Sequence, residues 1–105
     1  MIIGTIKEVK DNENRVGLTP IGVAALKKAG RQVLVEFGAG VNAGFPDVDY
    51  KKAGAKLASK KEVFQYADIL IKVKELIPVE YPLIPLLKNK ILFAFLHLAA
   101  VDPQL

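Results

Sequence analysis

Residues 19–37, Thr19-Pro-Ile-Gly-Val-Ala-Ala-Leu-Lys-Lys-Ala-Gly-Arg-Gln-Val-Leu-Val-Glu-Phe37, combine a complete helix signal with a strand signal that follows it directly. Thr19 offers a side-chain oxygen for the N-cap, Pro20 suits the first helical position, and Gly30 is placed just past the end. The segment 32–37 is rich in β-branched and aromatic residues, which is typical of a strand. This part of the chain therefore predicts a helix followed by a strand.

The same alternation extends in both directions along the chain. A β-branched strand is expected at 2–6, and Ser59 with Glu62 forms an S-x-x-E capping box for a helix at 60–66. The remaining signals predict a Gly-rich loop at 38–46, a short helix between Asp47 and Gly54, strands at 69–73 and 91–95, and a proline-marked helix or turn at 78–87. Alternating strands and helices imply right-handed crossovers. We expect an α/β fold with a doubly wound, mostly parallel sheet, a Rossmann-like or flavodoxin-like three-layer domain.

Composition restricts the possible function. The 105 residues, 51% of them hydrophobic, suffice for one core and predict a single domain over 1–105. The net charge of +4 comes from lysines interleaved with Asp and Glu, which disfavours a nucleic-acid partner. The absence of cysteine excludes disulfides, thiolate nucleophiles and cysteine-based metal sites, and we expect no metal.

Neither a signal peptide nor a membrane segment is expected. The N-terminus has no basic leader before an apolar region and no small-residue cleavage site. The longest apolar run, 91–101, is interrupted by His97 and falls short of the ~20 residues needed to span a bilayer. These features predict a cytoplasmic protein with no membrane contact.

One segment satisfies a dinucleotide-binding pattern but lacks its context. Gly38-Ala-Gly40-Val-Asn-Ala43 matches G-x-G-x-x-G/A directly after a predicted strand. In that motif a helix begins within the glycines, whereas Gly44-Phe45-Pro46 interrupts the chain before any helix can begin. The next strand, 56–58, carries no carboxylate at its tip to bind a ribose. We therefore interpret the segment as a loop whose glycines adopt positive φ, with no cofactor-binding residues.

Three polar side chains are expected at one edge of the sheet. Arg15 follows the first predicted strand, Lys74 follows 69–73, and His97 lies two positions after 91–95. Ligands of open parallel sheets bind outside the carboxyl ends of the strands, so these residues should converge. Arg15 and Lys74 suit a carboxylate, and the pKa of an ordinary histidine near neutrality suits proton exchange. The edge predicts proton chemistry beside a bound acid anion.

Each of these residues also has an ordinary structural interpretation. Arg15 could be a solvated loop charge, and His97 could cap backbone groups at a strand end. Lys72 shares a face with Lys74 by the period-two rule, so one of the two could extend from the sheet to solvent. Lys74 is the preferred ligand because it lies at the edge.

Four segments then resemble the N-terminal domain of the alanine dehydrogenase and nicotinamide nucleotide transhydrogenase family. They are Ile6-Lys-Glu-Val-Lys10, Asn12-Glu-Asn-Arg-Val-Gly-Leu-Thr-Pro20, Val35-Glu-Phe-Gly-Ala-Gly40 and Lys72-Val-Lys-Glu75. The segment Ile91-Leu-Phe-Ala-Phe-Leu-His-Leu-Ala-Ala100 resembles the alanine dehydrogenase branch, because the transhydrogenase branch usually lacks this histidine.

The resemblance implies particular roles for the three polar residues. Arg15 and Lys74 would bind the carboxylate of pyruvate or L-alanine, and His97, with Lys74, would take part in catalysis. The family reaction is the reversible, NAD-dependent oxidative deamination of L-alanine to pyruvate and ammonia. Two departures affect the loop that carries Lys74: Leu76 stands where the family commonly has proline, and Pro82 and Pro85 crowd the next helix.

The resemblance also implies that a nucleotide-binding domain is missing. Family members continue into a domain that supplies the NAD site, whereas this sequence ends at Leu105. We expect a truncated fold that binds no NAD and does not turn over alone, and that self-associates or joins a complementing nucleotide-binding domain. The apolar residues expected to lose their cover are Leu96, Leu98, Ala99, Ala100 and Val101. The alternatives are a non-catalytic binding module and a transhydrogenase domain.

Overall fold

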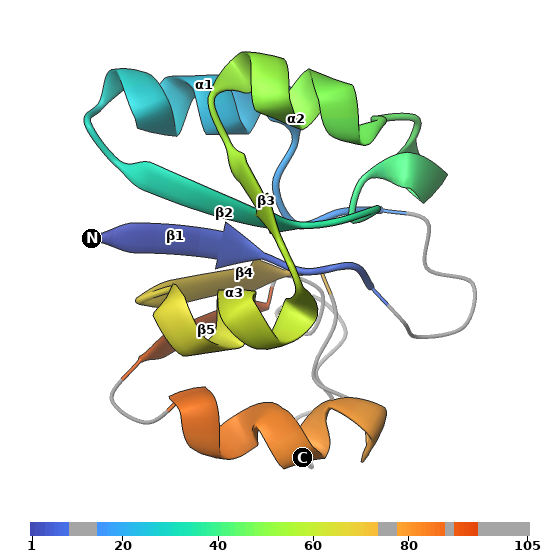
Figure 1. The fold of residues 1–105 in the computed structure, drawn as a ribbon, viewed down its shortest axis with the longest axis vertical. Helices are drawn as coiled ribbons and strands as arrows, with labels where there is room; N and C mark the ends of the chain where they lie inside the picture. Colours follow the sequence, from blue (N-terminus) through green and yellow to red (C-terminus); the bar gives the residue numbers. More distant parts are fainter. Residues whose placement is uncertain (9–14, 74–77, 88–89, 95–105) are drawn as a thin grey trace, which may run out of the picture.

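Five parallel strands form one sheet in the order β3-β2-β1-β4-β5 (Figure 1). The structure is a computed structural model and describes residues 1–8, 15–73, 78–87 and 90–94. The strands are β1 (Ile2–Thr5), β2 (Gln32–Glu36), β3 (Lys56–Ala58), β4 (Ile69–Lys72) and β5 (Ile91–Ala94). The chain moves outward from β1 to β3 and then returns to the other side of β1 for β4. The sheet order therefore reverses between β1 and β4.

Helices cover both faces of this sheet. The helices α1 (Pro20–Lys28) and α2 (Asp47–Ala53) lie together on one side, and α3 (Lys60–Tyr66) and the 3₁₀ helix η2 (Pro78–Leu87) lie on the other (Figure 1). A further 3₁₀ turn, η1 (Val41–Ala43), precedes α2. The predicted α/β, doubly wound, three-layer class is confirmed.

Each face of the sheet has its own core. Beneath α1 and α2, the fully buried side chains include Val23, Val35 and Tyr50. Beneath α3 and η2, Val63 and Phe64 are completely buried against strand residues and against Leu83 and Leu86 of η2. The two cores keep the sheet between them rigid up to its carboxyl edge.

The helix ends follow the signals in the sequence. Thr19 accepts a hydrogen bond from Gly22 N at 3.2 Å, and Gly30 adopts φ 85° after α1. The Ser59–Glu62 capping box is present in both directions. Strands end one residue earlier than predicted at Thr5, Glu36 and Lys72. The proline-marked segment 78–87 is a 3₁₀ helix with Pro82 and Pro85 inside it.

Candidate functional site

The reversal of strand order places a crevice at the carboxyl ends of β1 and β4. In open α/β sheets, ligands bind at such a switch point because the loops after the two strands diverge to opposite faces. The loop after β1 carries Arg15, and Val73 follows β4 directly. Both residues line one cleft of about 260 Å³, together with Val16, Thr19, Ala43 and Phe45.

The loop that carries Arg15 packs closely against the end of β4. A Cβ atom placed on Gly17 would lie 2.6 Å from the carbonyl oxygen of Ile71 and 3.0 Å from the Cα of Lys72. Real side-chain atoms do not approach backbone so closely, so only glycine lets the loop cross here. The buried Thr5 hydroxyl donates to the same Ile71 oxygen at 2.7 Å. The loop residue Gly17 therefore lies against β4, although it is 54 positions away from Ile71 in the sequence.

Five charged side chains gather at the carboxyl edge of the sheet, and we call them the edge cluster. They are Glu8, Glu36, Lys60, Lys72 and Glu80. Lys72 Nζ lies 2.9 Å from Glu8 Oε1 and 3.9 Å from Glu80 Oε1. Lys60 Nζ lies 3.1 Å from Glu80 Oε2 and 3.8 Å from Glu36 Oε1. Three carboxylates thus share two ammonium groups at the carboxyl edge of the sheet.

The members of the edge cluster differ in how deeply their side chains are buried. The side chains of Glu8, Lys72 and Glu80 are at most 2% exposed, whereas those of Lys60 and Glu36 are 20% and 16% exposed. Desolvation raises the pKa of Glu36 above its ordinary value, and the hydrogen bond from Lys7 N and the charge of Lys60 oppose that rise. The cluster is a buried polar network and not a set of solvated surface pairs.

The structure describes one of the three predicted site residues, Arg15, and not the other two. Arg15 is exposed at the mouth of the cleft and is engaged with other groups of the protein. Lys74 and His97 lie outside the described residues, as do Leu76 and the tail residues 96–101. Lys72 does not extend to solvent: it is buried and paired with Glu8. The expectation was that either Lys72 or Lys74 could extend to solvent, and Lys72 does not, because the carboxylate of Glu8 holds its ammonium inside.

Sequence reasoning missed the edge cluster. Glu8 and Lys72 are 64 positions apart, and neither forms a motif with its neighbours. The available signal was a lysine within the apolar strand Ile69–Lys72, which in a sheet covered on both faces requires a buried partner.

The Gly-rich loop does not have the arrangement of a dinucleotide-binding turn. Asp47 Oδ1 accepts from Gly38 N at 2.8 Å, so a carboxylate occupies the amide that a phosphate would need. The α-helix begins only at Asp47, and the loop follows β2, away from the switch point beside β1. Gly38 and Gly44 have positive φ as predicted.

Gly40 departs from the prediction made for it. Its φ is −101°, so positive φ does not explain the glycine. A Cβ there would lie 2.6 Å from the ring of Tyr50 and 2.9 Å from Phe45. Close packing beside the cleft is the reason for this glycine.

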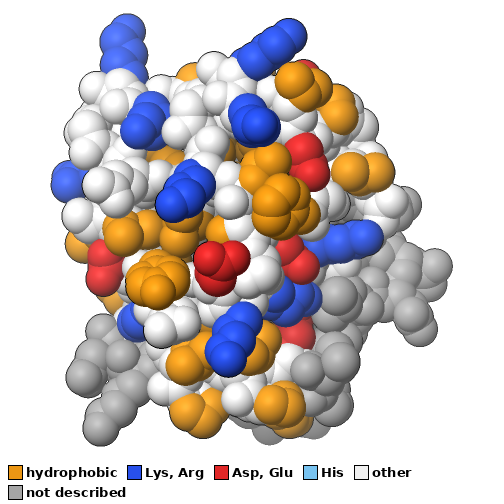
Figure 2. Space-filling view, in the orientation of Figure 1, with side chains coloured by type: hydrophobic (Ala, Val, Ile, Leu, Met, Phe, Trp, Pro, Cys, Tyr) orange, Lys and Arg blue, Asp and Glu red, His pale blue; other side chains and the backbone are white. Residues whose placement is uncertain are grey.

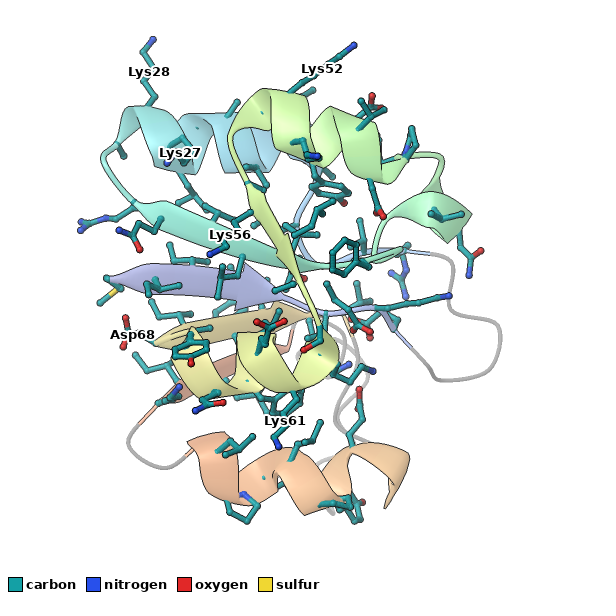
Figure 3. All side chains as sticks on the ribbon, in the orientation of Figure 1. Lys27, Lys28, Lys52, Lys56, Lys61 and Asp68 are labelled. Atoms are coloured by element: carbon teal, nitrogen blue, oxygen red, sulfur yellow. The ribbon has the colours of Figure 1, made fainter. Side chains whose placement is uncertain are left out.

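Surface charge is dispersed on the face that the figures show. In Figure 2, Lys and Arg side chains are spread over this face, and acidic side chains lie mainly across its middle and lower part. The lysines labelled in Figure 3 come from α1, α2, β3 and α3 and are spread over the face without converging. The described residues include no group of three His, Cys, Asp or Glu side chains that could hold a metal. No helix among them is long and apolar enough to cross a membrane.

Comparison with known proteins decides the ancestry. The family model described as alanine dehydrogenase/PNT, N-terminal domain, matches residues 4–105. The chain belongs to this family. It is 49% identical to an alanine dehydrogenase of Methanococcus maripaludis and 50% identical to one of Bacillus subtilis, in each case over the whole chain. The chain spans only 28% and 27% of the length of these relatives.

Solved structures agree with the sequence relatives. An L-alanine dehydrogenase superposes with a TM-score of 0.80 and 42% identity, over 97% of this chain and 28% of that one. A transhydrogenase from Sinorhizobium meliloti gives a TM-score of 0.73 and 35% identity, over 79% of this chain and 25% of that one. The chain therefore corresponds to the N-terminal part of an alanine dehydrogenase and resembles the transhydrogenase less.

Proposed function

We propose that this chain is the substrate-binding part of an alanine dehydrogenase and binds the carboxylate of pyruvate or L-alanine. The observation that carries the proposal is the cleft at the β1–β4 switch point, which Arg15 lines together with the residue that precedes Lys74. Arg15 supplies a planar pair of donors for a carboxylate, and Lys74 adds a second cation. The relatives are alanine dehydrogenases, which agrees with such a ligand.

The cleft is lined by one charged side chain and by several apolar ones. Val16, Phe45 and Val73 form apolar walls beside Arg15. Such walls exclude water and strengthen the attraction between a guanidinium and a carboxylate. A small 2-oxo acid matches this combination, because its carboxylate needs the cation and its methyl group needs an apolar wall.

His97 is proposed to exchange a proton with the oxygen or nitrogen on carbon 2 of the bound substrate. An ordinary imidazole titrates near neutrality and can serve in both directions of a reversible reaction. The overall reaction is L-alanine, NAD and water to pyruvate, ammonia and NADH. The Gly-rich loop of this chain does not fit NAD, so we assign the cofactor to a nucleotide-binding domain outside these 105 residues.

Ligand binding tests the proposal directly. Pyruvate is added to ¹⁵N-labelled protein and compared with methyl pyruvate, in which an ester replaces the carboxylate. We expect pyruvate to shift the backbone amides of Val16 and Val73 in a saturable manner, and methyl pyruvate to leave them unchanged. Equal responses to the two ligands, or no response to pyruvate, would contradict carboxylate binding.

The chain alone is expected not to oxidise L-alanine. Hydride transfer requires a nicotinamide within ~3–3.5 Å of the substrate carbon, and we assign that cofactor elsewhere. Purified protein mixed with L-alanine and NAD should produce no NADH, measured by absorbance. Turnover by the pure chain would show that a cofactor site exists within it.

An exposed apolar strand favours a macromolecular partner. Ile91, Leu92 and Phe93 of β5 are 56%, 41% and 46% exposed among the described residues. Side chains of this kind on a sheet strand are normally covered. We propose that a complementing domain or a second copy of the chain covers them. We also propose that the protein is cytoplasmic. Sedimentation velocity over a range of concentrations tests self-association, and a constant monomer mass would contradict it.

A further inference from the structure

Glu8 holds two groups at the end of β4 at once. Its Oε1 accepts from Lys72 Nζ at 2.9 Å, and its Oε2 accepts from the backbone N–H of Val73 at 3.1 Å. Both hydrogen bonds are buried. Glu8 lies three residues past the end of β1, so one carboxylate connects the two strands that flank the switch point.

The bond to Val73 N fixes a residue that lines the cleft. Val73 is one of the lining residues, and a buried carboxylate oxygen of Glu8 accepts from its peptide N–H. Glu8 therefore acts on the wall of the cleft through Val73.

The loop that carries Arg15 is held at two points on the same strand. Glu8 contacts Lys72 and Val73 on one side of Arg15 in the sequence, and Gly17 contacts Ile71 and Lys72 on the other. Both contacts are with residues at the end of β4 or directly after it. The described residues on either side of 9–14 are thus anchored to the same strand end.

Stability alone does not explain a buried pair of this kind. Removing a carboxylate and an ammonium from water costs several kcal/mol, and their attraction often only offsets that cost. An apolar pair of similar volume often replaces a buried ion pair without loss of stability. What the apolar pair would not provide is an acceptor for Val73 N.

We propose that Glu8 is a positioning residue for the carboxylate site, with Lys72 as its counter-ion. This inference rests on the proposed function, because it assigns Glu8 the task of orienting Val73, which lines the proposed carboxylate cleft together with Arg15. Lys72 is not a ligand of the substrate, since its ammonium is buried between Glu8 and Glu80. What matters at position 8 is a side-chain oxygen that accepts a hydrogen bond from Val73 N.

Two double variants separate positioning from packing. In Glu8→Gln/Lys72→Met, the amide oxygen at position 8 can still accept from Val73 N. In Glu8→Leu/Lys72→Met, the same volume is kept but the acceptor is lost. Neither variant leaves an unpaired ammonium in the interior. Urea unfolding is measured for both, and the Leu variant should be less stable by about 1–3 kcal/mol, because its buried Val73 N–H has lost its acceptor. Glu36→Gln is the matched control, because it removes a carboxylate of the edge cluster that does not contact β4.

Pyruvate affinity is then measured by NMR titration. We expect Glu36→Gln and Glu8→Gln/Lys72→Met to bind within about threefold of the wild type, and Glu8→Leu/Lys72→Met to bind at least about tenfold more weakly, the effect of one lost hydrogen bond. Equal affinity in the two double variants would overturn the inference, whether both are high or both are low.

Amide hydrogen exchange keeps this test separate from the proposed function. If the wild type does not bind pyruvate, the proposed function fails, but Val73 N–H still reports on Glu8. Slow exchange in the Gln double variant and fast exchange in the Leu double variant support positioning. The same exchange rate in both overturns it.

Discussion

The buried hydroxyl of Tyr50 donates a hydrogen bond to the carbonyl oxygen of Leu18 at 2.8 Å. This bond connects α2 to the residue that precedes the N-cap of α1. The Tyr50 ring also fills the space that Gly40 leaves, beside the cleft that Arg15 lines. One wall of the candidate site is therefore fixed by a contact between two helical regions.

Tyr50→Phe should lower the free energy of unfolding by about 1–2 kcal/mol, because it removes the donor for Leu18 and leaves the ring in place. Urea denaturation provides the measurement. Tyr66→Phe is the matched control, since Tyr66 is 54% exposed, and its effect should stay within about 0.5 kcal/mol. Equal effects at the two positions would show that the Tyr50 hydroxyl contributes nothing to stability.

Tyr50 should also make stability depend on alkaline pH. Desolvation, with a smaller effect from the charge of Asp47, raises the pKa of Tyr50 to about 12 from an ordinary value of 10.0. The native state therefore keeps the phenol proton more tightly than the unfolded state does, and stability from this group is complete below pH 10 and declines toward pH 12. The stability difference between wild type and Tyr50→Phe should shrink over that interval. A difference that is constant from pH 9 to 12 would argue against a shifted pKa.

Gly17→Ala should disturb the Arg15 loop. The new Cβ would meet the backbone of Ile71 at 2.6 Å, and neither strand nor loop can move without cost, so we expect a loss of about 1–3 kcal/mol. Pyruvate affinity should fall as well. In the control Gly22→Ala, the Cβ meets a movable Leu18 methyl group within a helix, where alanine is favoured. Similar destabilisation by both substitutions would contradict the close crossing at Gly17.

Glu36 should make the stability of the protein change with pH in the direction opposite to that of an ordinary paired carboxylate. Because desolvation raises its pKa, the native state favours the protonated form, and its stabilising contribution is present below pH 4.5 and declines as pH rises through the shifted pKa. Glu36→Gln removes this decline. The stability of Glu36→Gln relative to wild type should therefore be higher at pH 7 than at pH 4. The reverse order would indicate a lowered pKa.

Most of the fold could be predicted because local signals and tertiary packing agree. Thr19, Gly30 and the Ser59–Glu62 capping box act over four residues or fewer, and each is found where the sequence indicates. Strand ends were placed less accurately, since the last ladder partner depends on the neighbouring strand. The strand order that creates the switch point beside β1 could not be read from local patterns.

The candidate site could be predicted only in part. The edge rule identified Arg15 because it needs no knowledge of side-chain partners. The roles of Glu8 and Lys72 could not be predicted, because they depend on a contact between residues 64 positions apart. The close packing of Gly17 could not be predicted for the same reason, since its neighbour is the backbone of a distant strand.

Replacement of Arg15 tests the central claim most directly. Pyruvate is titrated into the wild type, Arg15→Ala and the control Arg31→Ala, which removes an exposed arginine directly before β2 and thus at the opposite edge of the sheet. A charge-assisted, two-donor contact predicts that Arg15→Ala weakens binding by at least about tenfold while Arg31→Ala changes it by less than about twofold. Equal affinity of Arg15→Ala and wild type would contradict a carboxylate site at the β1–β4 switch point.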